Sequence, residues 1–131
     1  MWQTFSISFC LVMVVGVLLL IVDPTCSDYG AKLQRVSADL EWITRSLEEY
    51  KQGSGNYPNE SEGLRAFVVC PASHPDPARW RQLLRDLPPD PWMTEYSYRL
   101  VPGSPRGFEI RSAGKDRKFG TKDDISSLDP E

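Results

Sequence analysis

The strongest constraint on this chain is an uncharged apolar run at residues 5–22, which can serve only as a membrane anchor or a secretory signal. At about 1.5 Å per helical residue, the run crosses most of a bilayer's hydrocarbon core. A secretory signal normally starts with a positive charge and has a core of only about 7 to 15 residues, whereas residues 1–4 contain no Lys or Arg. We therefore favour a retained anchor at residues 1–28, followed by one folded domain at residues 29–131.

The charges of the chain bear on its partners and on its orientation. The net charge is −3 and the aromatics are not interleaved with a basic patch, so we expect no nucleic-acid partner. Every Lys and Arg follows the apolar run. The positive-inside rule by itself therefore places the folded domain in the cytoplasm.

Between residues 29 and 52, apolar residues recur at alternating steps of three and four, which is typical of an amphipathic helix. The glycines that follow end this helix. The stripe consists of Leu33, Val36, Leu40, Ile43, Leu47 and Tyr50. The same spacing could mark a coiled coil, but it covers barely three heptads. We favour a helix that packs on its own domain's sheet.

A turn and a second, short helix are expected next, at residues 61–70. Asn59 or Ser61 can cap this helix, and Pro71 can end it. Prolines are dense from residue 72 to residue 91, which indicates an ordered loop that apolar side chains such as Trp80 must hold in place.

Two segments that alternate polar and apolar residues predict a β-hairpin at residues 95–112. The order of helix, short helix, irregular loop and hairpin places the domain in the α+β class, with a small antiparallel sheet. The hairpin leads into a loop at residues 112–125, called the acidic loop below, and we expect a frayed tail after it.

The acidic loop gathers three carboxylates around two glycines, a composition that can supply the oxygen ligands of Ca²⁺. It does not match the EF-hand pattern. A site here would use Asp116, one or both of Asp123 and Asp124, the Ser112 or Thr121 hydroxyl, and carbonyls such as that of Ala113. The alternative is a solvated turn, because Lys115, Arg117, Lys118 and Lys122 outnumber the aspartates.

Catalysis finds little support in the sequence. The single histidine, His74, lies in a proline-rich loop and is expected to be exposed rather than to act as a general base. No oriented nucleophile or phosphate-binding loop can be named, and we expect neither an enzyme nor a small-molecule substrate. Cys26 and Cys70 could form a disulfide only if the fold brings them together.

Several motifs, in order, resemble one family across about residues 33–125: the major pseudopilin, protein G, of type II secretion systems. The motifs include Gly55-Asn56-Tyr57-Pro58, Glu62-Gly63-Leu64, Trp80, Leu87-Pro88, Asp90-Pro91-Trp92, Tyr96-Ser97-Tyr98, Phe108-Glu109-Ile110 and Ser112-Ala113-Gly114. The resemblance implies a pilin-like fold, with a long N-terminal helix that begins in the bacterial inner membrane and a periplasmic α+β head.

The resemblance also implies a function. Family members polymerise through their N-terminal helices, with themselves and with other pseudopilins, into a pseudopilus that helps to export proteins across the outer membrane. They bind structural calcium in the loop after the hairpin, which corresponds here to Ala113, Asp116, Asp123 and Asp124. The alternative is a monomeric, membrane-anchored binding module that is not incorporated into a filament.

The sequence departs from the family pattern at three places. Residues 1–22 do not match the basic leader and the Phe-Thr-Leu-Ile-Glu motif that the family's peptidase processes. Met93 stands where the family has the glycine after Asp-Pro-Trp, and Arg117 stands where it has the glycine after the first loop aspartate. Losing glycine restricts the backbone at such positions.

Overall fold

The computed structural model describes residues 24–129, which belong to two compact units that divide between Gln34 and Arg35. The first unit is described only at residues 24–34, where helix α2 begins. The second, described at residues 35–129, is called the head below. Within the described residues, no helix is both long enough and apolar enough to span a membrane. The proposed anchor segment at residues 5–22 lies outside them.

Helix α2 spans Pro24–Ser54 and is longer at both ends than the expected range of 29–52. A proline is compatible with a first helical turn, where its missing N–H would have no intrahelical acceptor. At the other end, Gly55 adopts a φ of 85° and its N–H donates to the carbonyl of Lys51 at 2.8 Å. This left-handed glycine ends the helix.

The head's part of α2 presents a buried stripe, as the spacing predicted. Its members are no more than 8% exposed: Val36, Leu40, Ile43, Leu47 and Tyr50. Each such side chain contributes about 1.5 to 3 kcal/mol when it is fully buried. Because the stripe is buried by the same chain, the packed-helix interpretation is confirmed over the coiled coil.

The second helix, η1, is a short 3-10 helix at Gly63–Phe67, so the expected helix at 61–70 was too long. Gly63 has a φ of 52°, which interrupts any regular helix that begins at residue 61. Neither Asn59 nor Ser61 caps η1, whose N-cap is Glu62 without a side-chain hydrogen bond; the side-chain oxygen of Asn59 instead accepts the N–H of Glu62 at 2.9 Å in the turn before η1. The Glu62 carboxylate accepts the N–H of Asn59 at 3.0 Å in return.

A three-stranded antiparallel sheet follows, in the order β1-β2-β3. Strands β1 (Ser97–Leu100) and β2 (Phe108–Ser112) form the predicted hairpin, with Tyr98 opposite Ile110. Strand β3 (Ile125–Ser126) was not predicted, because two residues carry no alternation pattern. It pairs with β2, so the expectation of a frayed tail directly after the acidic loop was wrong.

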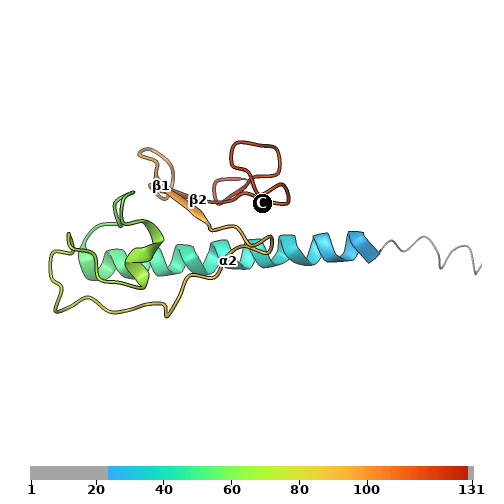
Figure 1. The fold of residues 1–131 in the computed structure, drawn as a ribbon. Coiled ribbons are helices and arrows are strands. Elements are labelled where there is room, and N and C mark those ends of the chain that lie inside the picture. The colour runs from blue at the N-terminus through green and yellow to red at the C-terminus, as the bar shows by residue number, and fades with distance from the viewer. Residues whose placement is uncertain (1–23, 130–131) are drawn as a thin grey trace, which may run out of the picture. The chain divides into compact units, whose positions relative to one another are not determined.

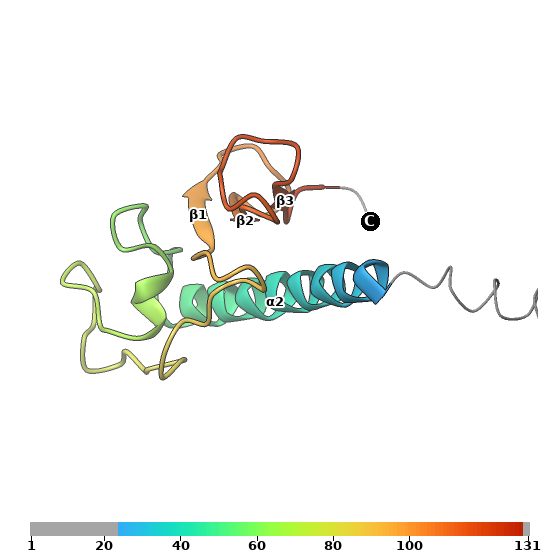
Figure 2. The ribbon, with the colours of Figure 1, turned by 45° about the vertical axis from the view of Figure 1, so that its right-hand side comes forward.

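The sheet lies along one side of the head's part of α2, and both ribbon views agree on this placement (Figures 1 and 2). Phe108, Ile110 and Phe67 are fully buried. The ring of Phe108 meets the ring of Tyr57 edge to face at 4.9 Å between centroids. The head is therefore built as helix against sheet, in agreement with the α+β prediction.

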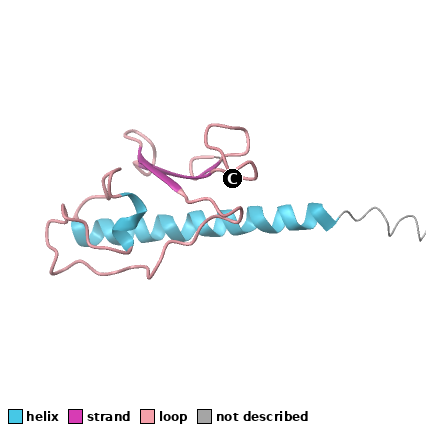
Figure 3. Ribbon diagram, viewed as in Figure 1, coloured by secondary structure: helices cyan, strands magenta, loops and turns pink. Residues whose placement is uncertain are grey.

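Much of the chain between η1 and β1 has no regular structure (Figure 3). Trp80 holds this segment in place, because its indole N–H donates to the carbonyl of Ala66 at 3.1 Å. The N–H groups of Leu83 and Leu84 both donate to the carbonyl of Phe67, at 3.0 and 3.1 Å. The segment is thus tied to η1, as the density of prolines and apolar residues indicated.

Candidate functional site

Asp90 closes a turn before the hairpin and is fully buried. One carboxylate oxygen accepts the N–H groups of Trp92 and Thr94, at 3.0 and 2.8 Å. The other accepts the hydroxyl of Ser112 at 2.6 Å. The Asp90-Pro91-Trp92 motif therefore joins the irregular segment to the last residue of β2, with both carboxylate oxygens satisfied.

Ser112 and Gly114 fix the entry of the acidic loop. The Ser112 hydroxyl, besides donating to Asp90, accepts the N–H of Gly114 at 3.1 Å. Gly114 has a φ of 66°, and a Cβ there would lie 1.9 Å from the carbonyl oxygen of Asp123. Only glycine lets the two sides of the loop approach so closely. The Ser112 hydroxyl proton is already used here, so the predicted ligand serves first as a structural link.

Asp124 is a partly buried carboxylate of the loop, with its side chain 12% exposed. Its Oδ2 accepts from Arg111 Nη1 at 3.1 Å and from the N–H of Gly120 at 2.8 Å. Its Oδ1 is buried and has no hydrogen-bond partner among the described residues. An unsatisfied buried acceptor costs about 1 to 3 kcal/mol, which a bound cation would relieve.

The other predicted ligands do not gather around Asp124 in a cluster of side chains. Asp116 is exposed, and its Oδ1 accepts the N–H of Lys118 at 2.9 Å. Across residues 24–129, no group of three or more His, Cys, Asp or Glu side chains is placed to hold a metal ion. Ca²⁺ also accepts backbone carbonyls and waters as ligands. The orphaned Oδ1 of Asp124 is the one observation here that a Ca²⁺ would explain, and the other ligands, the Ala113 carbonyl included, stay predictions.

A network of charged side chains, which the sequence did not predict, connects the β2 residue Glu109 to Asp124 through Arg111. Glu109 is 5% exposed and accepts hydrogen bonds from Arg99, from Arg111 Nη2 at 3.0 Å and from the Ser126 hydroxyl at 2.6 Å. Burial by itself raises the pKa of Glu109, but the donors of Ser126, Arg111 and Arg99 outweigh it and lower the pKa overall. Arg111 thus bridges Glu109 and Asp124. The sequence signal for this pair was the alternation of apolar and charged residues along the strand, which places Glu109 and Arg111 on the same face.

Two residues, Met93 and Arg117, have a positive φ without being glycine, at 69° and 58°. They are the only such residues in the described part of the chain. Both residues therefore adopt a left-handed backbone despite the side chain, at a cost of about 1 to 2 kcal/mol each.

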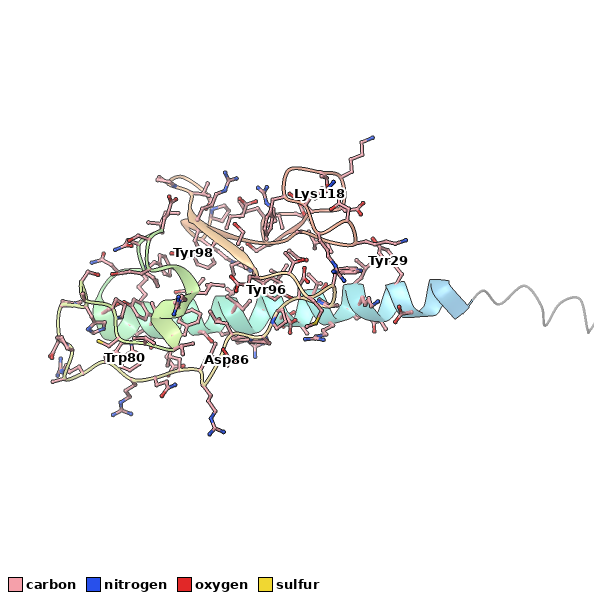
Figure 4. The ribbon with its side chains drawn as sticks, in the orientation of Figure 1. Tyr29, Trp80, Asp86, Tyr96, Tyr98 and Lys118 are labelled. Atoms are coloured by element: carbon pink, nitrogen blue, oxygen red, sulfur yellow. The ribbon has the colours of Figure 1, made fainter. Side chains whose placement is uncertain are left out.

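The Tyr57-Pro58 motif ties α2 to the hairpin. The Tyr57 hydroxyl donates to Glu48 at 2.7 Å, and burial together with this hydrogen bond raises the pKa of Tyr57 to about 12. The carbonyl of Pro58 accepts the hydroxyl of Tyr98 at 2.8 Å. Tyr96 donates to Asp39 at 2.8 Å, and Figure 4 shows both hairpin tyrosines in the space between β1 and α2. The motif residues are thus structural links.

His74 is buried at 6% exposure, so the expectation of an exposed histidine was wrong. Its ring meets the ring of Tyr50 edge to face at 5.8 Å, and its Nδ1 accepts the N–H of Asp76 at 3.2 Å. These contacts hold the loop against the end of α2.

Cys70 is a free thiol, and the side chain of Cys26 lies outside the described residues.

Known proteins resemble the chain over most of its length. Residues 26–128 match the family model of type II secretion system protein G. The chain is 34% identical over 121 residues to the type II secretion system core protein G of Pseudomonas aeruginosa, a match that covers 89% of this chain and 84% of that protein. It is 30% identical over 120 residues to the protein of the same name from Escherichia coli K12, covering 88% and 82%.

A solved structure has the same fold. The major pseudopilin of the type 2 secretion system of enterohaemorrhagic Escherichia coli aligns with a TM-score of 0.70 and 33% sequence identity. The alignment covers 82% of this chain and 92% of that one. The chain thus has a pseudopilin-like α+β fold, and it belongs to the type II secretion system protein G family.

Proposed function

We propose that this chain is a structural subunit of a type II secretion pseudopilus and supports protein export across the outer membrane. The observation that carries this proposal is the match of the head to a solved major pseudopilin, at a TM-score of 0.70 and 33% identity. The family's role is structural, so no enzymatic activity is proposed. The lone histidine supports this view, because its contacts with Tyr50 and Asp76 explain it as a packing residue.

The apolar run at residues 5–22 would anchor the subunit in the bacterial inner membrane, with the head in the periplasm. In the filament, the N-terminal helices would contact one another and those of other pseudopilins. A topology reporter fused at the C-terminus is expected to give a periplasmic signal. A cytoplasmic signal would follow the positive-inside rule and would contradict the pseudopilus role.

The filament role has a direct test. The full-length chain, produced together with a secretion assembly, is expected to crosslink through its N-terminal segment to itself and to other pseudopilins. If no such crosslink forms while the assembly exports its cargo, the filament role fails. The alternative of a monomeric binding module outside the filament would then be supported, although the family match does not favour it.

The acidic loop would bind one structural Ca²⁺. The support is the buried Oδ1 of Asp124, which lacks a partner among the described residues. One ion would join the exit of β2 to the segment that enters β3, which stabilises a head with a thin core. Thermal unfolding of the full chain in detergent is expected to shift upward with Ca²⁺ and downward with EDTA. Identical melting in both conditions would refute the site.

A further inference from the structure

A cleft in the head, called the acidic groove below, lies between η1, the loop at residues 86–88 and β1. It encloses about 570 Å³. Leu64, Leu87, Tyr96 and Tyr98 give it apolar and aromatic walls. It is an open cleft with both apolar and polar walls, and none of its lining residues belongs to the acidic loop.

The groove carries uncompensated negative charge. Its charged lining consists of four carboxylates and one guanidinium: Glu60, Glu62, Asp86, Glu95 and Arg65. None of these side chains takes part in an ion pair within the described residues. Burial raises the pKa of Tyr98, and the neighbouring Glu60 and Glu62 raise it further. The local potential in the groove is therefore negative.

Residues 115–122, the outer part of the acidic loop, carry a net positive charge, opposite in sign to that of the groove. This segment is called the basic tip. It carries four cations and one carboxylate: Lys115, Arg117, Lys118, Lys122 and Asp116, all exposed. Within residues 24–129, none of the four cations forms an ion pair. Phe119, 47% exposed, adds an apolar side chain in the middle of the tip. Interfaces are enriched in aromatic residues and have a polar rim, and the ring of Phe119 with the cations around it would match such a centre and rim.

We propose that the acidic groove of one copy of this chain receives the basic tip of a second copy. The charges of the two surfaces are complementary, and the groove's tyrosine and leucine walls offer an apolar surface to Phe119. The inference rests on the proposed filament function and adds to it the head surfaces that meet.

The placement of the two surfaces favours head-to-tail contact. Lys118, on the basic tip, lies well apart from Asp86, at the groove (Figure 4), and the two ribbon views place the acidic loop and η1 at different ends of the sheet. A contact between two different surfaces is heterologous, and it propagates into an open filament when the rotation does not close.

A contact of this size would be weak between free monomers. In a filament, the helices of neighbouring subunits already hold the heads close together, which raises their effective concentration. The groove and the tip would then set the spacing and the rotation between successive heads. Electrostatic contacts of this kind weaken as ionic strength rises.

The test uses crosslinking of the full-length chain in membranes that also contain the secretion assembly. One tagged copy carries Glu95→Cys and a second, differently tagged copy carries Lys118→Cys, with the native cysteines replaced by Ala. A short bismaleimide is expected to join the two copies. The control pairs Lys118→Cys with Glu49→Cys, an exposed carboxylate outside the groove, and its yield is expected to be at least about tenfold lower.

Charge reversal separates a specific contact from random collision. Asp86→Lys alone or Lys115→Glu alone is expected to lower the 95–118 crosslink by about tenfold. The two reversals together are expected to restore the yield to within about threefold, because the surfaces become complementary again. Equal yields in all four backgrounds would overturn the proposal, as would capture of a different protein by the cysteine at position 95.

The experiment also separates this inference from the filament role. Crosslinking through the native Cys10, in a parallel strain that keeps it, reports contact between the N-terminal segments. If that crosslink forms and the 95–118 crosslink does not, the head-to-tail contact is refuted and the filament role stands. If neither forms, both are refuted.

Discussion

Two carboxylates, the fully buried Asp90 and the partly buried Asp124, differ in how many of their oxygens are satisfied. Asp90 has both oxygens satisfied, by the N–H groups of Trp92 and Thr94 and by the Ser112 hydroxyl. Asp124 has one oxygen satisfied, by Arg111 and Gly120, while its other oxygen is buried without a partner in the described residues. The first is a complete structural link. The second has one oxygen left for a donor or a cation from outside the chain.

The largest effect is expected from Asp90→Ala. The change leaves three donors without their acceptor, at the point where the irregular segment meets β2, and we expect a loss of about 3 to 4 kcal/mol in the free energy of unfolding. Chemical denaturation of the full chain in detergent measures it. Asp76→Ala, on an exposed loop position, is the control and should change stability by less than about 0.5 kcal/mol. A similar small change for Asp90→Ala would contradict the role of the link.

The next effect concerns calcium. At a Ca²⁺ concentration of about 100 times the dissociation constant, a bound ion stabilises the native state by about 2.7 kcal/mol. We expect Asp124→Asn to abolish this calcium-dependent shift in unfolding. Asp90→Asn should lower the baseline stability but keep the shift, because Asp90 is already satisfied. If Asp124→Asn keeps the full calcium response, the ion is not held by Asp124.

A smaller effect, of opposite sign, is expected at the two strained turns. Met93→Gly and Arg117→Gly should each stabilise the head by about 0.5 to 1 kcal/mol, because glycine adopts a positive φ without steric cost but loses more entropy on folding. Thermal unfolding detects this change. Lys122→Gly, at an exposed position where φ is not positive, should instead be neutral or destabilising. Equal responses at all three positions would show that φ strain is unimportant.

The smallest effect is a dependence on pH. The lowered pKa of Glu109 means that its contribution to stability is fully present above its unfolded value, near 4.5, and is lost as pH falls through the lower pKa of the folded state. Stability of the wild type should therefore fall as the pH is reduced below about 4.5, and Glu109→Gln should flatten this dependence. Denaturant midpoints measured between about pH 3 and pH 6 test it. A slope that Glu109→Gln leaves unchanged would assign the dependence to other carboxylates.

The helix stripe and the hairpin could be read from the sequence because their signals are periodic. A period of three and four placed Val36, Ile43 and Leu47 on one face, and these residues are buried. Alternation predicted both strands of the hairpin. The extent of η1 could not be predicted in the same way, because the backbone of Gly63 ends up in a left-handed conformation.

The candidate site was predicted in composition but not in arrangement. The aspartates of the acidic loop were identified from the sequence, yet Asp116 is exposed, whereas Asp124 is partly buried and accepts a hydrogen bond from Arg111. The role of Arg111 depends on β2 running beside the returning loop, which the pairing of β3 with β2 secures. That strand has two residues and no pattern of its own.

The sequence by itself determined the α+β class, the amphipathic helix, the hairpin and the family, because each rests on spacing along the chain. Only the tertiary structure decided that Asp90 is satisfied and Asp124 is not, and that the acidic groove and the basic tip lie apart on one head. Local patterns fix which way a side chain faces on its own element. Which donors and charges it meets there depends on segments that fold back from far along the chain, and loop closure and packing decide that.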